Sequence, residues 1–202
     1  MADVVAPVPT EDEHRILASS SRSAEPTHVL KDGDTFAVFA TDGDMAAADA
    51  DALNVPNALS SDFLNSFTSG AIGTAGASAQ SIASAADINI LSGLITAKQL
   101  IAAATSSRSA TGAASNANGS TFEDLVVAGA PVTVGDGAVA PNTQFALPGV
   151  GYVVLNEQTV SGDGVTTTGI TVNMIHVVLQ DALTGAKTGE IVVGSATSSV
   201  GS

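Results

Sequence analysis

The chain has 202 residues, of which 45% are hydrophobic and only 3% aromatic, and it contains neither Trp nor Cys. Its net charge of -14 argues against binding to nucleic acid or to anionic membrane surfaces, because phosphate groups are bound by Lys and Arg. The missing Cys excludes thiol catalysis, Cys-ligated zinc and disulfides. No apolar run reaches the ~18 residues of a membrane-spanning helix, so we expect no membrane insertion.

The first 26 residues are predicted to form an extended arm ahead of a single β-domain at 27–202. The arm contains three Pro, an acidic cluster at Glu11, Asp12 and Glu13, and a Ser run, and it keeps neither a helical nor a strand period. A disordered tail and an arm that docks on a neighbouring subunit are both open. "ADVVAPVPT" after Met1 is typical of a mature N-terminus, so we expect a signal peptide that is absent from this chain.

The next segment is predicted to begin with a strand and to continue into helix. "TFAVFAT" lies between two Asp-Gly-Asp units, and Asp-Gly favours turns. Short helices are expected near 44–67, with Asp44 as a possible cap and Pro56 as a stop. The Gly, Ala, Ser and Thr residues of 69–86 fit either a flexible loop or a closely packed strand.

An acidic cluster in this region has two interpretations. Carboxylates in irregular loops are good calcium ligands, although the spacing is not that of an EF-hand. Turn formation and helix capping explain the same side chains without metal, and no other cofactor is expected. The candidate calcium ligands are Asp32, Asp34, Asp42, Asp44, Asp49 and Asp51.

From residue 87 onward the pattern is that of β-structure. Short segments rich in Val, Ile and Thr, such as "GYVVLNEQTV", "ITVNMIHVVLQD" and "GEIVVGSATSS", are separated by Gly, Pro, Asn and Asp. We therefore predict an all-β fold, an antiparallel β-sandwich or related barrel, with short helices near 44–67 and an extended N-terminal arm.

The strongest local signal is a hairpin that carries polar side chains. If its turn centres near 164 and 165, Leu155 lies opposite Ile175, Val154 opposite His176, and Glu157 opposite Asn173. The polar side chains that would then converge are Asn156, Glu157, Gln158, Asn173 and His176.

The chemistry of this polar group is structural in our interpretation. A His beside a Glu is able to act as a general base, but the chain has no Ser in a GxSxG motif and no HExxH zinc motif. Ligand binding is the second alternative. We expect no enzyme activity and a hydrogen-bonded network that fixes strand register.

Five segments resemble a known family of exported proteins. "SGLITAKQLIAAATSS", "STFEDLVVAGAPV", "VAPNTQFALPGVGYVVLNEQ", "ITVNMIHVVL" and "GEIVVGSATSSV" are similar to the bacterial choice-of-anchor P family over about 87–200, with a further likeness from about residue 27. The resemblance implies export and residence outside the cell or at its surface, and it supplies no catalytic residues. "SATSSVGS" carries no hydrophobic anchor, which departs from the pattern.

Two functions are compatible with these observations. The first is an extracellular structural protein, a self-assembling surface-layer or fibre subunit whose arm pairs with a neighbouring copy. The alternative is a secreted adhesive or glycan-binding module, which the single Tyr and absent Trp disfavour because sugar sites use exposed aromatic rings.

Overall fold

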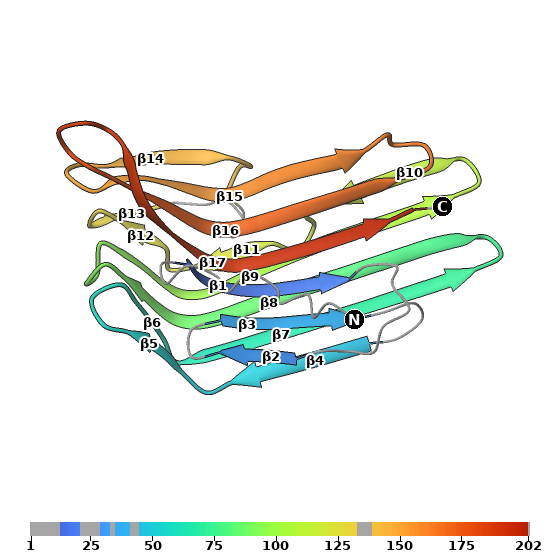
Figure 1. The fold of residues 1–202 in the computed structure, drawn as a ribbon, viewed down its shortest axis with the longest axis horizontal. Helices are drawn as coiled ribbons and strands as arrows, with labels where there is room; N and C mark the ends of the chain where they lie inside the picture. The colour runs from blue at the N-terminus through green and yellow to red at the C-terminus, as the bar shows by residue number, and fades with distance from the viewer. Residues whose placement is uncertain (1–12, 21–28, 33–34, 41–44, 133–138, 202) are drawn as a thin grey trace, which may run out of the picture.

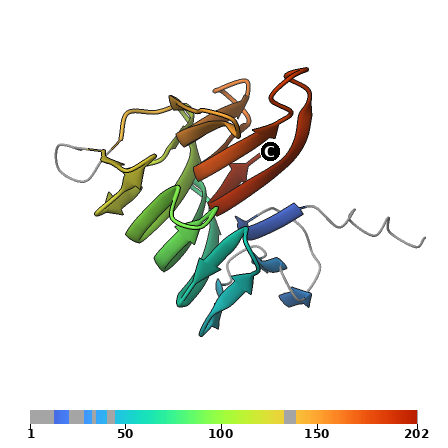
Figure 2. The ribbon, with the colours of Figure 1, turned by 90° about the vertical axis from the view of Figure 1, so that its left-hand side faces the viewer.

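The fold consists of two facing β-sheets. The computed structural model describes residues 13–20, 29–32, 35–40, 45–132 and 139–201, and for 13–40 it describes the backbone alone. Within these ranges the chain contains strands and no helix, and therefore no helix that could cross a membrane. The predicted all-β fold is confirmed as a sandwich, whose two layers are seen end-on in Figure 2.

The first sheet has seven strands and holds both the predicted hairpin and the start of the described chain (Figure 1). Its strands, in spatial order, are β14 (Thr143–Leu147), β15 (Gly151–Gly162), β16 (Thr168–Gln180), β17 (Lys187–Val200), β1 (Glu13–Ser20), β3 (Thr35–Ala40) and β2 (Val29–Asp32).

The second sheet has ten strands and is built around the long hairpin of β8 and β9. Its main path runs through β13 (Ala130–Pro131), β12 (Val126–Val127), β9 (Ile95–Ser109), β8 (Gly76–Ile90), β6 (Leu59–Ser61) and β5 (Leu53–Val55). The remaining strands are β10 (Gly112–Asn116) and β11 (Thr121–Glu123) beside β9, β7 (Phe63–Gly73) beside β8, and β4 (Met45–Ala50) beside β7.

The helices expected near 44–67 are wrong, because residues 45–67 lie in strands β4 to β7 and their turns. Pro56 does not end a helix but begins a turn, in which the Ala58 N–H donates to the Val55 carbonyl at 3.0 Å and Asn57 has a φ of 63°. Pro followed by a residue with positive φ is the pattern of a type II turn. The segment 69–86 is strand, and the strand predicted at "TFAVFAT" is confirmed as β3.

Part of the predicted arm belongs to the seven-stranded sheet. β1 lies between β17 and β3 and pairs in parallel with both. Every other pairing between described strands is antiparallel. Residues 1–12 and 21–28, the rest of the predicted arm, lie outside the described residues.

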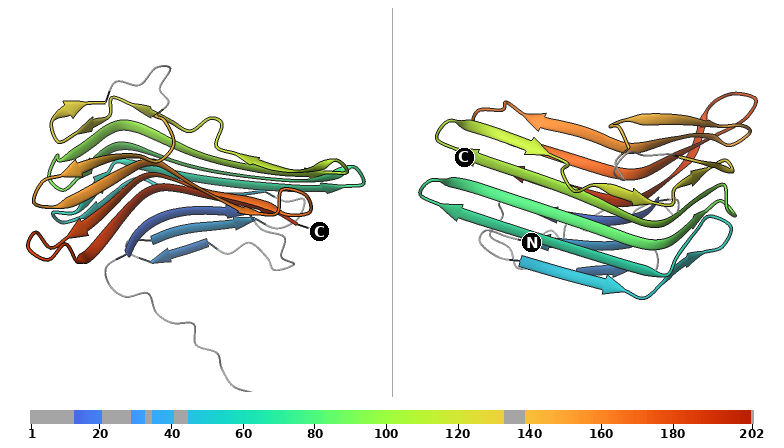
Figure 3. Two further views of the ribbon diagram at one scale, coloured as in Figure 1. Left: turned by 90° about the horizontal axis from the view of Figure 1, so that it is seen from above. Right: turned by 180° about the vertical axis from the view of Figure 1, so that it is seen from behind.

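Both sheets bend near the middle of their long strands, as Figure 3 shows from above. In the seven-stranded sheet the ladders skip one row of residues, Asn156, Met174 and Gly194, and the first and last of these have φ values of 48° and 67°. In the ten-stranded sheet the β8–β9 ladder skips Asp87, whose φ is 50°. Irregular residues of this kind kink a strand locally, as β-bulges do.

The two bends fit into one another at Gly194. A Cβ atom there would overlap the Leu100 side chain of the opposite sheet and lie 3.3 Å from the Met174 Cβ. Leu100 itself is fully buried. Gly194 is therefore required twice, by its positive φ and by the close approach of the second sheet.

The bend separates the core into two halves of different composition. One half is aliphatic and contains Ile88, Ile90, Ile95, Leu147, Leu155, Ile175, Val177 and Ile191. The other half is built from small and hydroxyl side chains, including Ser66, Thr68, Ala79, Ser81, Ala83, Ala102, Ala104, Ser106, Ala196 and Ser198. There the Oγ atoms of Ser81 and Ser106 donate across to backbone carbonyls of β17, at 2.6 and 3.1 Å, so the sheets approach more closely than the ~10 Å that is usual.

We expect Gly194→Ala to lower the free energy of unfolding by about 2–5 kcal/mol, because it adds left-handed strain to overpacking against Leu100. The control is Gly185→Ala, where φ is 69° but no atom lies within 4 Å of the new Cβ, so only about 1–2 kcal/mol should be lost. Urea midpoints measure both, and equal losses would contradict the nested bend.

Candidate functional site

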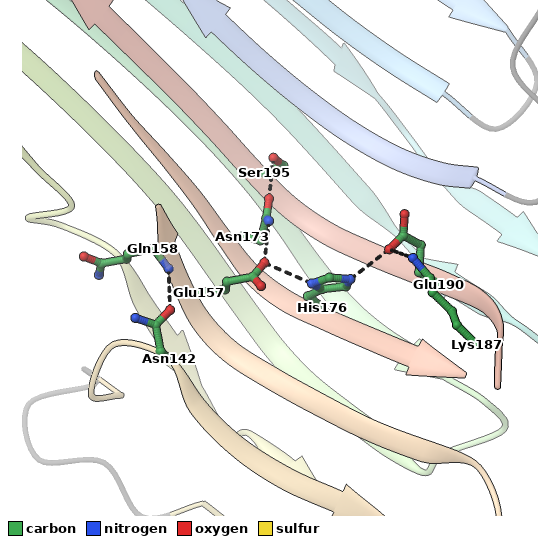
Figure 4. A network of polar contacts seen from close by, with 8 residues as sticks. All are labelled: Asn142, Glu157, Gln158, Asn173, His176, Lys187, Glu190 and Ser195. Carbon is green, nitrogen blue, oxygen red and sulfur yellow. Dashed lines mark hydrogen bonds and ion pairs between the residues drawn. The ribbon is translucent and has the colours of Figure 1, made fainter. Parts of the chain in front are cut away.

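The polar hairpin has the register that the sequence predicted. Leu155 lies opposite Ile175, Val154 opposite His176, and Glu157 opposite Asn173. Asn173 Nδ2 donates to Glu157 Oε2 at 2.8 Å, and His176 Nδ1 lies 2.9 Å from the same oxygen. These three predicted side chains therefore meet on the outer face of the seven-stranded sheet (Figure 4).

The network extends to residues of β17 that the sequence did not point to. His176 Nε2 lies 3.0 Å from Glu190 Oε2, which also accepts from Lys187 Nζ at 2.7 Å. Ser195 Oγ donates to Asn173 Oδ1 at 2.7 Å. Glu190 is diagonal to His176 on the neighbouring strand, and this register follows only from the sheet order. The contacts join β15, β16 and β17.

The imidazole of His176 is held between two carboxylates. A neutral ring has one N–H and donates to only one of them, whereas an imidazolium donates from both nitrogens. Glu157 and Glu190 lie on opposite sides of the ring, so they do not converge on one point as the ligands of a single metal ion would. The arrangement suits a hydrogen-bonded cross-link between strands.

The ionisation of Glu190 is shifted by this environment. The hydrogen bond from Lys187 lowers the pKa of the Glu190 carboxyl, and the contact with His176 adds to the effect, while partial burial opposes it. The folded protein therefore favours the charged carboxylate, which is the form that both donors require.

The other two predicted residues do not join this network. Asn156 is buried, and its Nδ2 donates to the Val139 carbonyl at 2.6 Å while its Oδ1 accepts from Gln158 Nε2 at 2.9 Å. The positive φ of Asn156 turns its side chain away from His176. Asn142 Oδ1 accepts the Gln158 N–H at 2.8 Å, so these residues hold the β14–β15 edge together.

The outer face of the seven-stranded sheet is the concave side of the bend (Figure 3), and the network lies on that face (Figure 4). His176, Glu157 and Glu190 have side-chain exposures of 18%, 28% and 20%. Val192 and Ser195 are buried although they also face outward from the sheet. The concave curvature reduces the contact of this face with water, which strengthens polar interactions within it.

The predicted calcium site is only partly within the described residues. Asp34, Asp42 and Asp44 lie outside them, and for Asp32 only the backbone is described. Asp49 and Asp51 are exposed, at the end of β4. Among the residues with described side chains, no group of three His, Cys, Asp or Glu is placed to hold a metal ion. Calcium binding by the whole cluster stays a prediction.

Comparisons of the chain with models of protein families, with curated proteins and with solved structures find no match.

We expect His176→Ala and Glu157→Ala each to lower the free energy of unfolding by about 1–3 kcal/mol, because each leaves half-buried polar partners unsatisfied. The matched control is Lys98→Ala, which breaks an ion pair with Glu123 whose side chains are 60% and 48% exposed and should change stability little. Denaturant midpoints provide the measurement. Unchanged midpoints for both network variants would contradict a structural role.

Acid should weaken the folded state in part through Glu190. Because folding lowers the pKa of this carboxyl from its usual 4.5, its contribution is complete above that pH and is lost as the pH falls toward the folded-state value. Glu190→Gln should therefore show a smaller loss of stability than the unmodified protein between about pH 5 and pH 3. Parallel pH dependences of the two melting temperatures would rule this out.

Proposed function

We propose that this chain is an extracellular structural protein that builds a surface layer or fibre by pairing β1 with a neighbouring copy. The position of β1 carries the proposal. This strand occupies the middle of a sheet, and it pairs in parallel with β17 and β3 where the other described strands pair in antiparallel fashion. A strand inserted in this way forms the same ladders whether it comes from its own chain or from another.

The surface beneath β1 supports an exchangeable strand. β1 lies against β7 and β8 of the opposite sheet, whose buried side chains there are small. Ser66 Oγ and Thr68 Oγ1 of β7 are buried and have no hydrogen-bond partner among the residues with described side chains. Each such hydroxyl costs about 1–3 kcal/mol, which weakens this part of the sandwich relative to the aliphatic half of the core.

The topology fixes where a donated strand would leave its acceptor. Ser20, the last residue of β1, lies beside Ala40 and Ser198, while Val29 at the start of β2 lies beside Val38. Both ends of the connection 21–28 therefore lie at one end of the sandwich. We call this end of the sandwich the C-terminal end. Besides the ends of the connection, it comprises the turns 73–76 and 109–112, the loop 163–167 and Gly201. The connection spans at most about 30 Å.

Residence outside the cell rests on composition and on the resemblance described above. A chain without Cys and with a net charge of -14 folds without disulfides and is highly soluble before assembly. A strand donated from copy to copy without closing into a ring yields a filament, and a reciprocal exchange yields a closed pair.

The test removes β1 and returns it as a peptide. A chain lacking 2–20 should stay monomeric in sedimentation velocity at concentrations at which the full chain assembles, and it should bind the peptide "EHRILASS" with one-to-one stoichiometry. The control peptide carries Leu17→Pro, because Pro removes a ladder donor and is poorly tolerated inside a sheet. A full chain that is monomeric at every concentration would overturn the proposal in favour of the adhesive or glycan-binding module.

A further inference from the structure

Exposed apolar side chains gather at the C-terminal end. Ile72 is 48% exposed beside the turn 73–76, and Val165 is 65% exposed in the loop 163–167. Val160, near the end of β15 that leads into this loop, is 66% exposed. Met45, at the near end of β4, is 67% exposed. Among the residues with described burial, only Phe63 and Leu183 are comparable side chains located elsewhere. This end therefore exposes more large apolar side chains than the opposite end of the sandwich, which favours a contact there.

The loop holds Val165 in a fixed position. Asp163 Oδ1 accepts the backbone N–H groups of Val165, Thr166 and Thr167 at 2.8–2.9 Å. The Gly164 carbonyl accepts the Ala113 N–H at 3.1 Å, which ties the loop to β10 of the other sheet. Because the loop is already ordered, a partner that binds to it meets a small entropy cost.

The same end contains a cation for which no ion pair is found among the residues with described side chains. Arg108, the last but one residue of β9, has a buried Nε atom that makes no hydrogen bond. Lys98 and Lys187, by contrast, are paired with Glu123 and Glu190. A guanidinium forms its strongest contacts with a carboxylate, so Arg108 is suited to an acidic group brought in from outside the chain.

We infer that two copies of this chain meet through their C-terminal ends. The inference rests on the proposed exchange of β1. In that exchange the residues 21–28 would join Ser20 in the acceptor copy to Val29 in the donor copy. The C-terminal ends of the two copies would then lie within about 30 Å of each other. The apolar side chains of one copy then pack on those of the other. Arg108 pairs with a carboxylate of the second copy, and Asp163 provides one at the same end. A contact between identical ends is self-complementary and joins two copies into a closed pair, so a layer or fibre would grow from such pairs through other surfaces.

The first test compares one substitution at opposite ends of the molecule. Val165→Asp and Ile72→Asp should each reduce the association constant at least about tenfold, as expected for a charge placed in an apolar contact. Leu183→Asp is the matched control, because Leu183 is 96% exposed in the loop between β16 and β17 at the other end of the sandwich. Arg108→Gln should also weaken association, and its effect should shrink in high salt. Sedimentation equilibrium of the full chain gives the constants.

The second test uses the absence of Cys from the chain. A short bis-maleimide should cross-link Val165→Cys into a covalent dimer on a denaturing gel, whereas Leu183→Cys should give no covalent dimer. Cross-linking of Leu183→Cys instead, or a larger loss of association with Leu183→Asp, would overturn the inference. If removal of β1 abolishes assembly while Val165→Asp, Ile72→Asp and Arg108→Gln do not, the contact is wrong and the exchange of β1 stands. If the full chain never associates, both are wrong.

Discussion

The contact between Gly194 and Leu100 sets the geometry on which the rest of the molecule depends. Two facing sheets that bend sharply must bend at the same place, because a packed interior leaves no space for a mismatch. The seven-stranded sheet turns its convex side toward its partner at the row of Asn156, Met174 and Gly194, and only a residue without a side chain leaves room there for Leu100. The bend also changes which residues face inward, so that Met174 and Ile175 are adjacent in sequence and both buried.

The polar network is a consequence of the same bend. Its residues lie on the concave outer face, where curvature brings the side chains of β15, β16 and β17 closer than on a flat sheet (Figures 3 and 4). His176 lies between Glu157 and Glu190, and the Asn173 amide links Glu157 to Ser195. Because these contacts cross three strands, they oppose any slip in register, which on a two-residue repeat would turn every side chain to the wrong face.

The sequence predicted the features that depend on neighbouring residues and missed those that depend on sheet order. Turn chemistry and apolar alternation around "LNEQ" and "VNMIHV" were sufficient for the register of β15 on β16. Asn156 was wrongly predicted to converge with His176, because no local sequence pattern indicates a positive φ at an Asn inside a strand. Glu190 was missed because its contact with His176 requires β17 to lie beside β16. The helices near 44–67 were expected from Asp44 as a cap and Pro56 as a stop, but Pro56 begins a turn between paired strands instead.

Whether β1 stays in its own chain depends on a small difference between the free energies of the closed and the exchanged forms. The ladders with β17 and β3 are the same in the closed and the exchanged forms, so they cancel. Two quantities remain. The effective concentration of the tethered strand, on the order of millimolar for a short flexible connection, favours the closed form. Any contact that forms only between copies favours the exchanged form. Assembly at micromolar protein then requires that new contact to contribute about 4 kcal/mol. A few apolar side chains at about 1–2 kcal/mol each are sufficient for this, and the C-terminal end is where the described residues expose them. In the proposed assembly the strand would determine which copies are joined, and the end contact would determine the concentration at which they join.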